Sequence, residues 1–278
     1  MKYSVHAGLW MAQWTDEITP ILKTVAELGY DGVEVSLLGM TDEKAAALGK
    51  SVREYGLEVT CSDGLSKDKD ITSADPVVRE AGIEYLKWAI KTTSLIGARG
   101  LAGVLYAPWG VYDPANKEAR SERSATAFAA VNDELNQYDV TLGLEAINRF
   151  ETDLVNTAAE ATAMANASGS DRVGVLLDTF HLNIEEKNIE TAITGTADKL
   201  VHFHVSDNDR GVPGSGHVPW NTVKSALDKI NYDSWIVAEM FVIAGNPASS
   251  DLNIWRNIEP DATKAAQQAL SFMRGHFG

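Results

Sequence analysis

The sequence predicts an α/β protein that folds as a single (β/α)8 barrel, a TIM barrel, with one domain over residues 1–278. Short apolar runs alternate with segments of helical periodicity eight times, which implies parallel strand pairing. The runs are largely apolar, as expected where helices cover both faces of a sheet. The open alternative, a doubly wound sheet, lacks support because no Gly-x-Gly-x-x-Gly motif follows the first strand.

The expected strands are short and are separated by about one strand–helix unit each. They cover residues 3–10, 33–38, 57–62, 101–106, 140–147, 173–178, 200–205 and 235–239. Helices are expected from about residue 15 to Gly29 and over 42–55, 76–96, 116–138, 157–167, 189–193, 221–230 and 260–273. Gly29 and Gly56 end the first two helices, and Pro76 suits the first turn of the third. No linker divides the chain.

Composition and charge indicate what kind of protein this is and which partners it lacks. The 278 residues are 45% hydrophobic, enough for one large core. A formal net charge of −15 argues against a nucleic-acid partner, which needs a clustered positive face. The single cysteine, Cys61, cannot form an internal disulfide, and no apolar run is long enough to span a membrane. We therefore expect a soluble, cytoplasmic protein without a membrane partner.

Four consecutive strands end in side chains that can bind a metal. These residues are Glu145, Asp178, His204 and Glu239, about one strand–helix unit apart. Chemistry in such barrels sits at the carboxyl ends of the strands, and neighbouring strands lie roughly 4.8 Å apart, so the four groups can converge. Taken alone, each residue is more simply interpreted as an isolated acid in a salt bridge at a strand end. Four such residues at the same ends of four consecutive strands favour a shared metal site.

Three converging carboxylates repel one another unless protons or a cation neutralise them. An oxygen-rich set with one imidazole suits Mn2+, Mg2+ or Co2+ better than a structural zinc. The sequence therefore predicts a divalent metal site at the ends of strands five to eight.

Other residues gather at the same end of the expected barrel. The Gly-rich segment 211–217 is either a phosphate-binding loop or a flexible turn, and its lack of lysine favours the turn. Trp10, Trp14 and Trp109 are either core residues or an apolar wall against a sugar, and we favour the wall. His202 lies deeper than its neighbour two residues on and is expected in the core. Cys61 is expected in packing or in the substrate wall.

Several blocks resemble the ketose 3-epimerases, the D-tagatose and D-allulose (psicose) 3-epimerase group within the xylose-isomerase-like barrels. The resemblance covers nearly the whole chain, including Gly8-Leu-Trp10, Trp14 and Asp63-Gly-Leu65. Its specific part is the set of blocks Gly143–Thr152 with Asn156, Leu177–His181, His202–Arg210, Pro213–His217 and Ala238-Glu239.

The resemblance implies roles for individual residues. Metal ligands would be Glu145, Asp178, His204 and Glu239, usually on Mn2+ in this family, and Glu145 and Glu239 would also act as the acid/base pair. Glu151, His181 and Arg210 would bind the O1–O3 end of the sugar. Trp14 and Trp109 are expected to contact the substrate as part of the aromatic wall described above. His6 stands where some members carry an aromatic residue that contacts the sugar. Relatives are expected to form homodimers or homotetramers.

The expected function is metal-dependent epimerisation at C3 of free ketoses of the D-tagatose, D-fructose/D-allulose or L-ribulose type, through a cis-enediolate. The alternative is an aldose–ketose isomerase of the same superfamily. Endonuclease-like members need more histidine ligands and a basic groove, so six histidines and a net charge of −15 argue against that class. A non-catalytic sugar-binding protein would leave the acid pair without a role.

Overall fold

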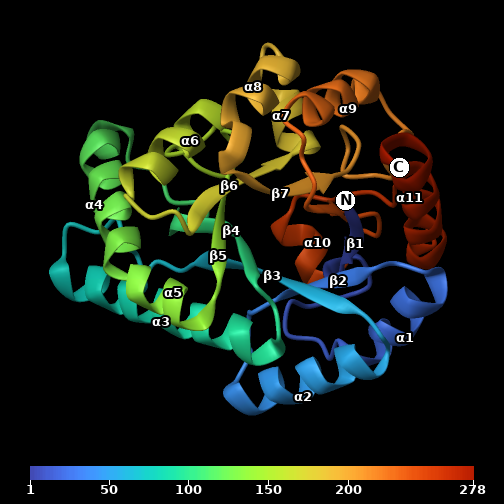
Figure 1. The fold of residues 1–278 in the computed structure, drawn as a ribbon, viewed down its shortest axis with the longest axis horizontal. Helices are drawn as coiled ribbons and strands as arrows, with labels where there is room; N and C mark the ends of the chain where they lie inside the picture. Colours follow the sequence, from blue (N-terminus) through green and yellow to red (C-terminus); the bar gives the residue numbers. More distant parts are fainter.

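The computed structural model describes residues 1–278, and its eight parallel strands close into a barrel within a ring of helices (Figure 1). Each strand pairs with its neighbours in sequence, and β1 pairs with β8 to close the barrel. The predicted (β/α)8 barrel is thereby confirmed. The strands are β1 (Lys2–His6), β2 (Gly32–Ser36), β3 (Glu58–Leu65), β4 (Gly100–Pro108), β5 (Thr141–Glu145), β6 (Val173–Asp178), β7 (Leu200–Val205) and β8 (Trp235–Ala238).

Helices surround the barrel and follow most of the strands. They are α1 (Thr19–Leu28), α2 (Asp42–Glu54), α3 (Pro76–Ile96), α4 (Lys117–Ala130), α5 (Asn132–Tyr138), α6 (Ala158–Ala167), α7 (Thr179–Glu185), α8 (Ile189–Thr196), α9 (Trp220–Lys229), α10 (Pro247–Asp251) and α11 (Ala262–Phe277). Short 3-10 turns cover Ala7–Leu9, Pro114–Asn116 and Ala197–Lys199. None of these helices combines the length and the apolar character needed to cross a bilayer.

Local sequence sets several helix ends. Gly29 ends α1 in the left-handed region at φ 90°, a conformation that costs glycine little. Thr157 and Glu160 form a reciprocal capping box at the start of α6. Pro76 occupies the first turn of α3, where Asp75 accepts the N–H of Val77.

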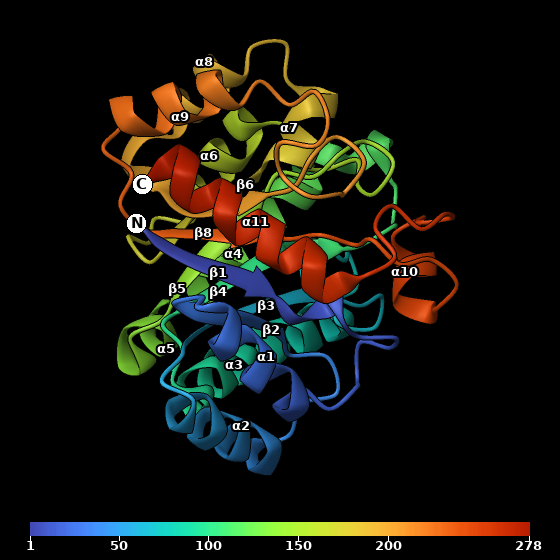
Figure 2. The same ribbon diagram turned by 90° about the vertical axis from the view of Figure 1, so that its right-hand side faces the viewer.

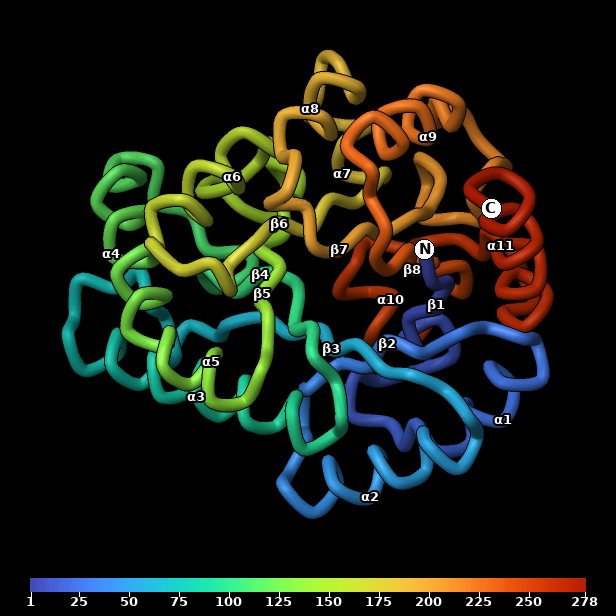
Figure 3. Tube along the Cα trace, viewed as in Figure 1, coloured from blue at the N-terminus to red at the C-terminus, as the bar shows by residue number.

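The barrel core is continuous from its first strand to its last helix. One cluster of buried apolar side chains includes Tyr3 on β1 and Phe277 on α11. The chain termini accordingly lie close together, as both the side view and the tube trace show (Figures 2 and 3). At the other end of the barrel, α10 lies beyond the arrowhead of β1, over the carboxyl ends of the strands (Figure 2).

Three of the differences between the expected elements and the structure have a clear local description. The helix expected over 116–138 breaks at Val131, which is fully buried and has a non-helical ψ of 9°. The first helix begins at Thr19 because the Asp16 carboxylate accepts the N–H groups of Ala12 and Gln13 and holds a turn there. The first strand ends at His6, where the chain enters a 3-10 turn.

Candidate active site

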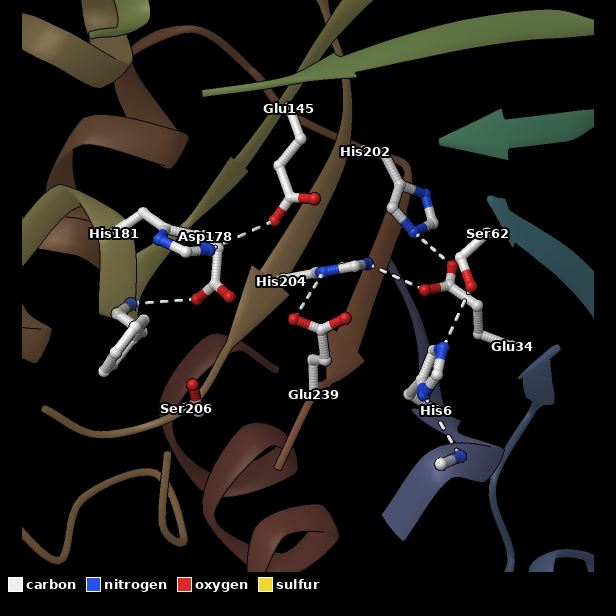
Figure 4. Close-up of polar contacts among 12 residues, drawn as sticks. His6, Glu34, Ser62, Glu145, Asp178, His181, His202, His204, Ser206 and Glu239 are labelled. Carbon is white, nitrogen blue, oxygen red and sulfur yellow. Dashed lines mark hydrogen bonds and ion pairs between the residues drawn. The ribbon is translucent and has the colours of Figure 1, made fainter. Parts of the chain in front are cut away.

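Strands β5 to β8 bring the four predicted metal-capable side chains to one point. Glu145 and Asp178 are the last residues of β5 and β6, and Asp178 is the register partner of His204 on β7. Glu239 directly follows β8. One ligand atom from each of the four lies within 4.8 Å of the others. Figure 4 shows these side chains pointing toward one another, with Glu34 on the far side of the His204 ring.

Arg210 balances part of the negative charge of this cluster. Its guanidinium contacts the Asp178 carboxylate and lies 2.9 Å from Glu239 Oε2, while the Phe180 ring covers it at 4.1 Å. The backbone of Arg210 is in the left-handed region at φ 66°, which is uncommon for a residue with a side chain. Hydrogen bonds of its backbone to Asp207 and Phe241 hold this conformation.

The two glutamates of the cluster are in opposite electrostatic environments. Burial and the nearby charge of Glu239 raise the pKa of Glu145 well above its usual value. Burial also opposes ionisation of Glu239, but its contacts with His204 and Arg210 outweigh that and hold its pKa well below the usual range. Burial raises the pKa of Asp178 to about 6 against the opposing charge of Arg210. The surroundings therefore favour a proton on Glu145 over one on Glu239.

The donor set of the cluster fits a divalent cation. Both ring nitrogens of His204 are buried without a well-aligned hydrogen bond, and Nδ1 faces Glu239 Oε2 at 3.4 Å while Nε2 faces Glu34 Oε1 at 2.8 Å. Buried nitrogens of this kind are costly unless something binds them. Three carboxylates and one imidazole match the preference of Mn2+, Mg2+ and Co2+ for oxygen with occasional nitrogen. These four residues could therefore hold such a cation.

The loop after β5 forms a rigid polar corner beside the cluster. Glu151 accepts hydrogen bonds from the Asn148 amide at 2.7 Å and from the Trp109 indole at 3.0 Å. His181 Nδ1 accepts the Asn148 N–H at 3.1 Å, so its Nε2 faces Glu145 at 3.6 Å and the Arg210 guanidinium at 3.0 Å. The three side chains that the resemblance linked to the sugar, Glu151, His181 and Arg210, thus line one wall of the same cavity.

Aromatic side chains and hydroxyls line the opposite wall of this cavity, whose volume of about 310 Å³ is typical of a small-molecule site. Trp14, Phe241 and His6 form a cluster with edge-to-face contacts. Trp14 also donates its indole N–H to Asp251, which joins the loop after β1 to α10. Trp109 also lines the cavity, but on the side of Glu151, to which it donates its indole N–H.

One expectation for this end of the barrel was wrong. Trp10 is not among the residues lining the cavity, because its indole turns toward α11 and donates to Thr263. The segment 211–217 is a turn, the interpretation that the sequence favoured over a phosphate loop, since the buried Asp207 carboxylate accepts the N–H groups of Gly214 and Val218. An internal anion thus takes the donors that a phosphate would need.

His202 and Cys61 are buried as predicted. His202 lies in the barrel interior and bonds to Glu34, and burial raises the pKa of the Cys61 thiol. Asn156 supports the corner by donating to backbone carbonyls of Ile147 and Thr152, whereas Arg149 turns outward to Glu185.

Sequence reasoning missed several residues that line the cavity. They are Ser36, Ser62, Phe241 and Asp251. Strand periodicity could have found the serines, because alternate residues of a strand share a face, and Ser36 and Ser62 lie two residues beyond the inward-facing Glu34 and Thr60. No sequence signal identifies Asp251, which reaches the cavity only through the position of α10.

Residues 22–276 match the family model described as the xylose isomerase-like TIM barrel. The chain belongs to this family. A D-psicose 3-epimerase of Agrobacterium fabrum is 33% identical over 99% of this chain and 98% of its own. An L-ribulose 3-epimerase of Mesorhizobium japonicum is 34% identical over 98% of this chain and 93% of its own.

The fold agrees with that of solved relatives. A crystal structure of a D-psicose 3-epimerase in the presence of D-fructose has a TM-score of 0.96 and 32% identity, with 100% of each chain covered. These comparisons identify this xylose isomerase-like barrel as a member of the ketose 3-epimerase group and as an enzyme of the isomerase class.

Proposed function

We propose that this enzyme inverts C3 of free ketoses in a metal-dependent reaction. The observation that carries the proposal is the pair of glutamates from β5 and β8, Glu145 and Glu239. They approach one point, and their environments shift the two pKa values in opposite directions. Two carboxyls whose surroundings favour protonation of one and ionisation of the other suit the acid and base roles that an epimerisation needs.

Each residue of the pair moves one proton in the proposed reaction. One glutamate removes the proton from C3 on one face of the sugar, which leaves a cis-enediolate. The other glutamate gives a proton to C3 on the opposite face, so the configuration inverts and the overall proton count is unchanged. Side chains from β5 and β8 suit this exchange because they come from different sides of the metal-capable cluster.

The four residues at the ends of β5 to β8 would hold the cation, which we propose to be Mn2+, with Co2+ or Mg2+ as alternatives. When bound, a divalent cation supplies Lewis-acid stabilisation of negative charge on the ketose oxygens. Glu151, His181 and Arg210 bind the hydroxyls at the O1–O3 end and keep the sugar in register with the glutamates. Trp14, Trp109 and His6 contact the remainder of the sugar.

The test is turnover of individual ketoses by chelated enzyme with single metals added back. D-Fructose, D-tagatose, D-allulose and L-ribulose are incubated in turn, and the products are separated by chromatography. We expect the C3 epimer from at least one ketose, only when metal is present. Aldose products would indicate the alternative isomerase, and sugar binding without any turnover in the presence of metal would contradict an enzymatic role.

We also propose that the protein is a one-domain, cytoplasmic homodimer or homotetramer. The side chains of Phe150 and Trp255 support an oligomer, since they are 71% and 73% exposed beside the mouth of the cavity. The unpaired Cys61 suits a reducing compartment. Analytical ultracentrifugation that finds only a 30.1 kDa monomer would contradict the oligomer, and two separate unfolding transitions would contradict the single domain.

A further inference from the structure

A carboxylate that the proposed chemistry does not use lies in the interior of the barrel. Glu34, on β2, is 0% exposed. Its Oε2 lies 2.7 Å from His202 Nε2 and accepts the Thr60 hydroxyl at 2.8 Å, and its Oε1 lies 2.8 Å from His204 Nε2. Figure 4 shows Glu34 between the two imidazole rings, on the side of His204 away from Glu145 and Asp178.

These distances decide between a hydrogen-bonded group and a second cation site. Donors that share a tetrahedral zinc at about 2.0–2.1 Å lie roughly 3.3 Å apart. The contacts from Glu34 to the two histidines are 2.7 and 2.8 Å, which is hydrogen-bond distance. An oxygen and a nitrogen this close need a proton between them, even where the angle is imperfect, because two lone pairs would repel.

The position of Glu34 has a consequence for His204. Glu34 accepts the Thr60 hydroxyl and faces an imidazole nitrogen with each of its oxygens, so it is placed as the hydrogen-bond acceptor for three donors. The proton between Glu34 and His204 therefore sits on Nε2. With Nε2 committed to Glu34, the other ring nitrogen, Nδ1, faces Glu239 and the rest of the metal-capable cluster.

We propose that Glu34 is the positioning residue of the site: it fixes the His204 ring and keeps a proton on Nε2, so that the Nδ1 lone pair is available to a cation. His202 and Thr60 in turn hold Glu34. Histidine ligands commonly donate their second N–H to a carboxylate, which sets the tautomer and strengthens the nitrogen as a ligand. Such an arrangement also accounts for a fully buried carboxylate, which is costly without several donors.

The inference rests on the proposed cation site but not on the ketose chemistry, so its test measures metal binding rather than turnover. Titration calorimetry with Mn2+ compares the chelated wild-type protein with Glu34→Gln. We expect the Mn2+ affinity of the variant to fall about 10- to 100-fold. Asp63→Asn is the matched control, because it removes another buried carboxylate among the cavity-lining residues without touching His204, and its affinity should change less than threefold.

Equal losses of Mn2+ affinity in the two variants would mean that only the negative charge of Glu34 matters, which would overturn the proposal. Wild-type Mn2+ affinity in Glu34→Gln would also overturn it. Wild-type protein that binds no divalent cation overturns this inference together with the metal site. Cation binding without epimerisation counts only against the proposed function. Should Glu34→Gln fail to fold, nitrogen-15 NMR of histidine-labelled wild-type protein with Mg2+ decides: we expect His204 to carry its proton on Nε2, and a proton on Nδ1 would contradict the assignment.

Discussion

The two halves of the barrel mouth place different groups around their buried acids. In the half built by β5 to β8, the Arg210 guanidinium contacts both Asp178 and Glu239, and Glu239 also faces His204. In the half built by β1 to β4, Asp63 accepts hydrogen bonds from the neutral Tyr85 hydroxyl and Gly64 N–H, and burial raises its pKa to about 6. The first half thus concentrates charge for chemistry, while the second offers aromatic and hydroxyl surface for recognition.

The largest predicted effect is the loss of either glutamate from the charged half. Glu145→Gln and Glu239→Gln should each lower kcat by about 10²–10⁴-fold, the usual worth of a general acid or base. Steady-state assays with the best ketose measure this loss. A matched change in the other half, Asp63→Asn, should retain most of the activity. Either glutamine variant with more than a tenth of wild-type kcat would contradict the proposed roles.

Arg210→Met should destabilise the protein without metal by about 3–5 kcal/mol, because it leaves buried carboxylates uncompensated. Denaturant unfolding measures the loss. The control is Arg120→Met, which breaks a buried ion pair with Asp153 away from the cavity. Added Mn2+ should recover part of the stability of Arg210→Met relative to wild type, and should leave the deficit of Arg120→Met unchanged. Equal recovery in both variants would contradict binding of the cation beside Arg210.

Asp63→Asn should stabilise the protein at pH 8 by about 2–3 kcal/mol. The folded-state pKa of about 6 lies above the ordinary value of 3.8, so the folded protein binds the proton more tightly and Asp63 destabilises the fold above pH 6. The advantage of the variant should shrink as pH falls through 6 toward 4. Urea unfolding from pH 5 to 8 tests this, with the exposed Asp171→Asn as control. A stability advantage of Asp63→Asn over wild type that grows toward low pH would contradict the raised pKa of Asp63.

The smallest effect belongs to the hydroxyl surface. His6 Nδ1 accepts the Gly8 N–H at 3.1 Å, so its Nε2–H donates to Ser62 Oγ at 2.9 Å and leaves the serine proton free for a sugar oxygen. Ser62→Ala should therefore raise KM about 3- to 10-fold, roughly 1 kcal/mol, with kcat nearly unchanged. Ser271→Ala, on the surface of α11, serves as control. A change confined to kcat would place Ser62 in the chemistry instead.

Sequence alone predicted the charged half better than the recognition half. Strand alternation fixes which residues end β5 to β8, and the parallel order brings Asp178 beside His204, so Glu145, Asp178, His204 and Glu239 could be predicted to meet. Long-range packing determines which other side chains reach the cavity. Nothing near Trp10 indicates that its indole turns to α11, and nothing near Asp251 indicates that α10 carries it to the cavity.

Side-chain partners across the barrel were also beyond the sequence. Glu34 lies in an apolar strand whose pattern suggests only burial, and its contacts with His202 and His204 depend on the closed barrel. The kink at Val131 depends likewise on how that residue packs into the core, since helical periodicity continues through it. Periodicity predicts which face is buried, and tertiary packing determines what lies opposite that face.

Turnover in D2O tests the central claim most directly, because it follows the proton that Glu145 and Glu239 would exchange. The metal-loaded enzyme is incubated with D-fructose, D-tagatose or L-ribulose in D2O, and the recovered sugars are examined by proton NMR. The account predicts deuterium at C3 of the epimer, and loss of this exchange in Glu145→Gln and Glu239→Gln. Deuterium only at C1 or C2, or an epimer that carries no deuterium at C3, would contradict it.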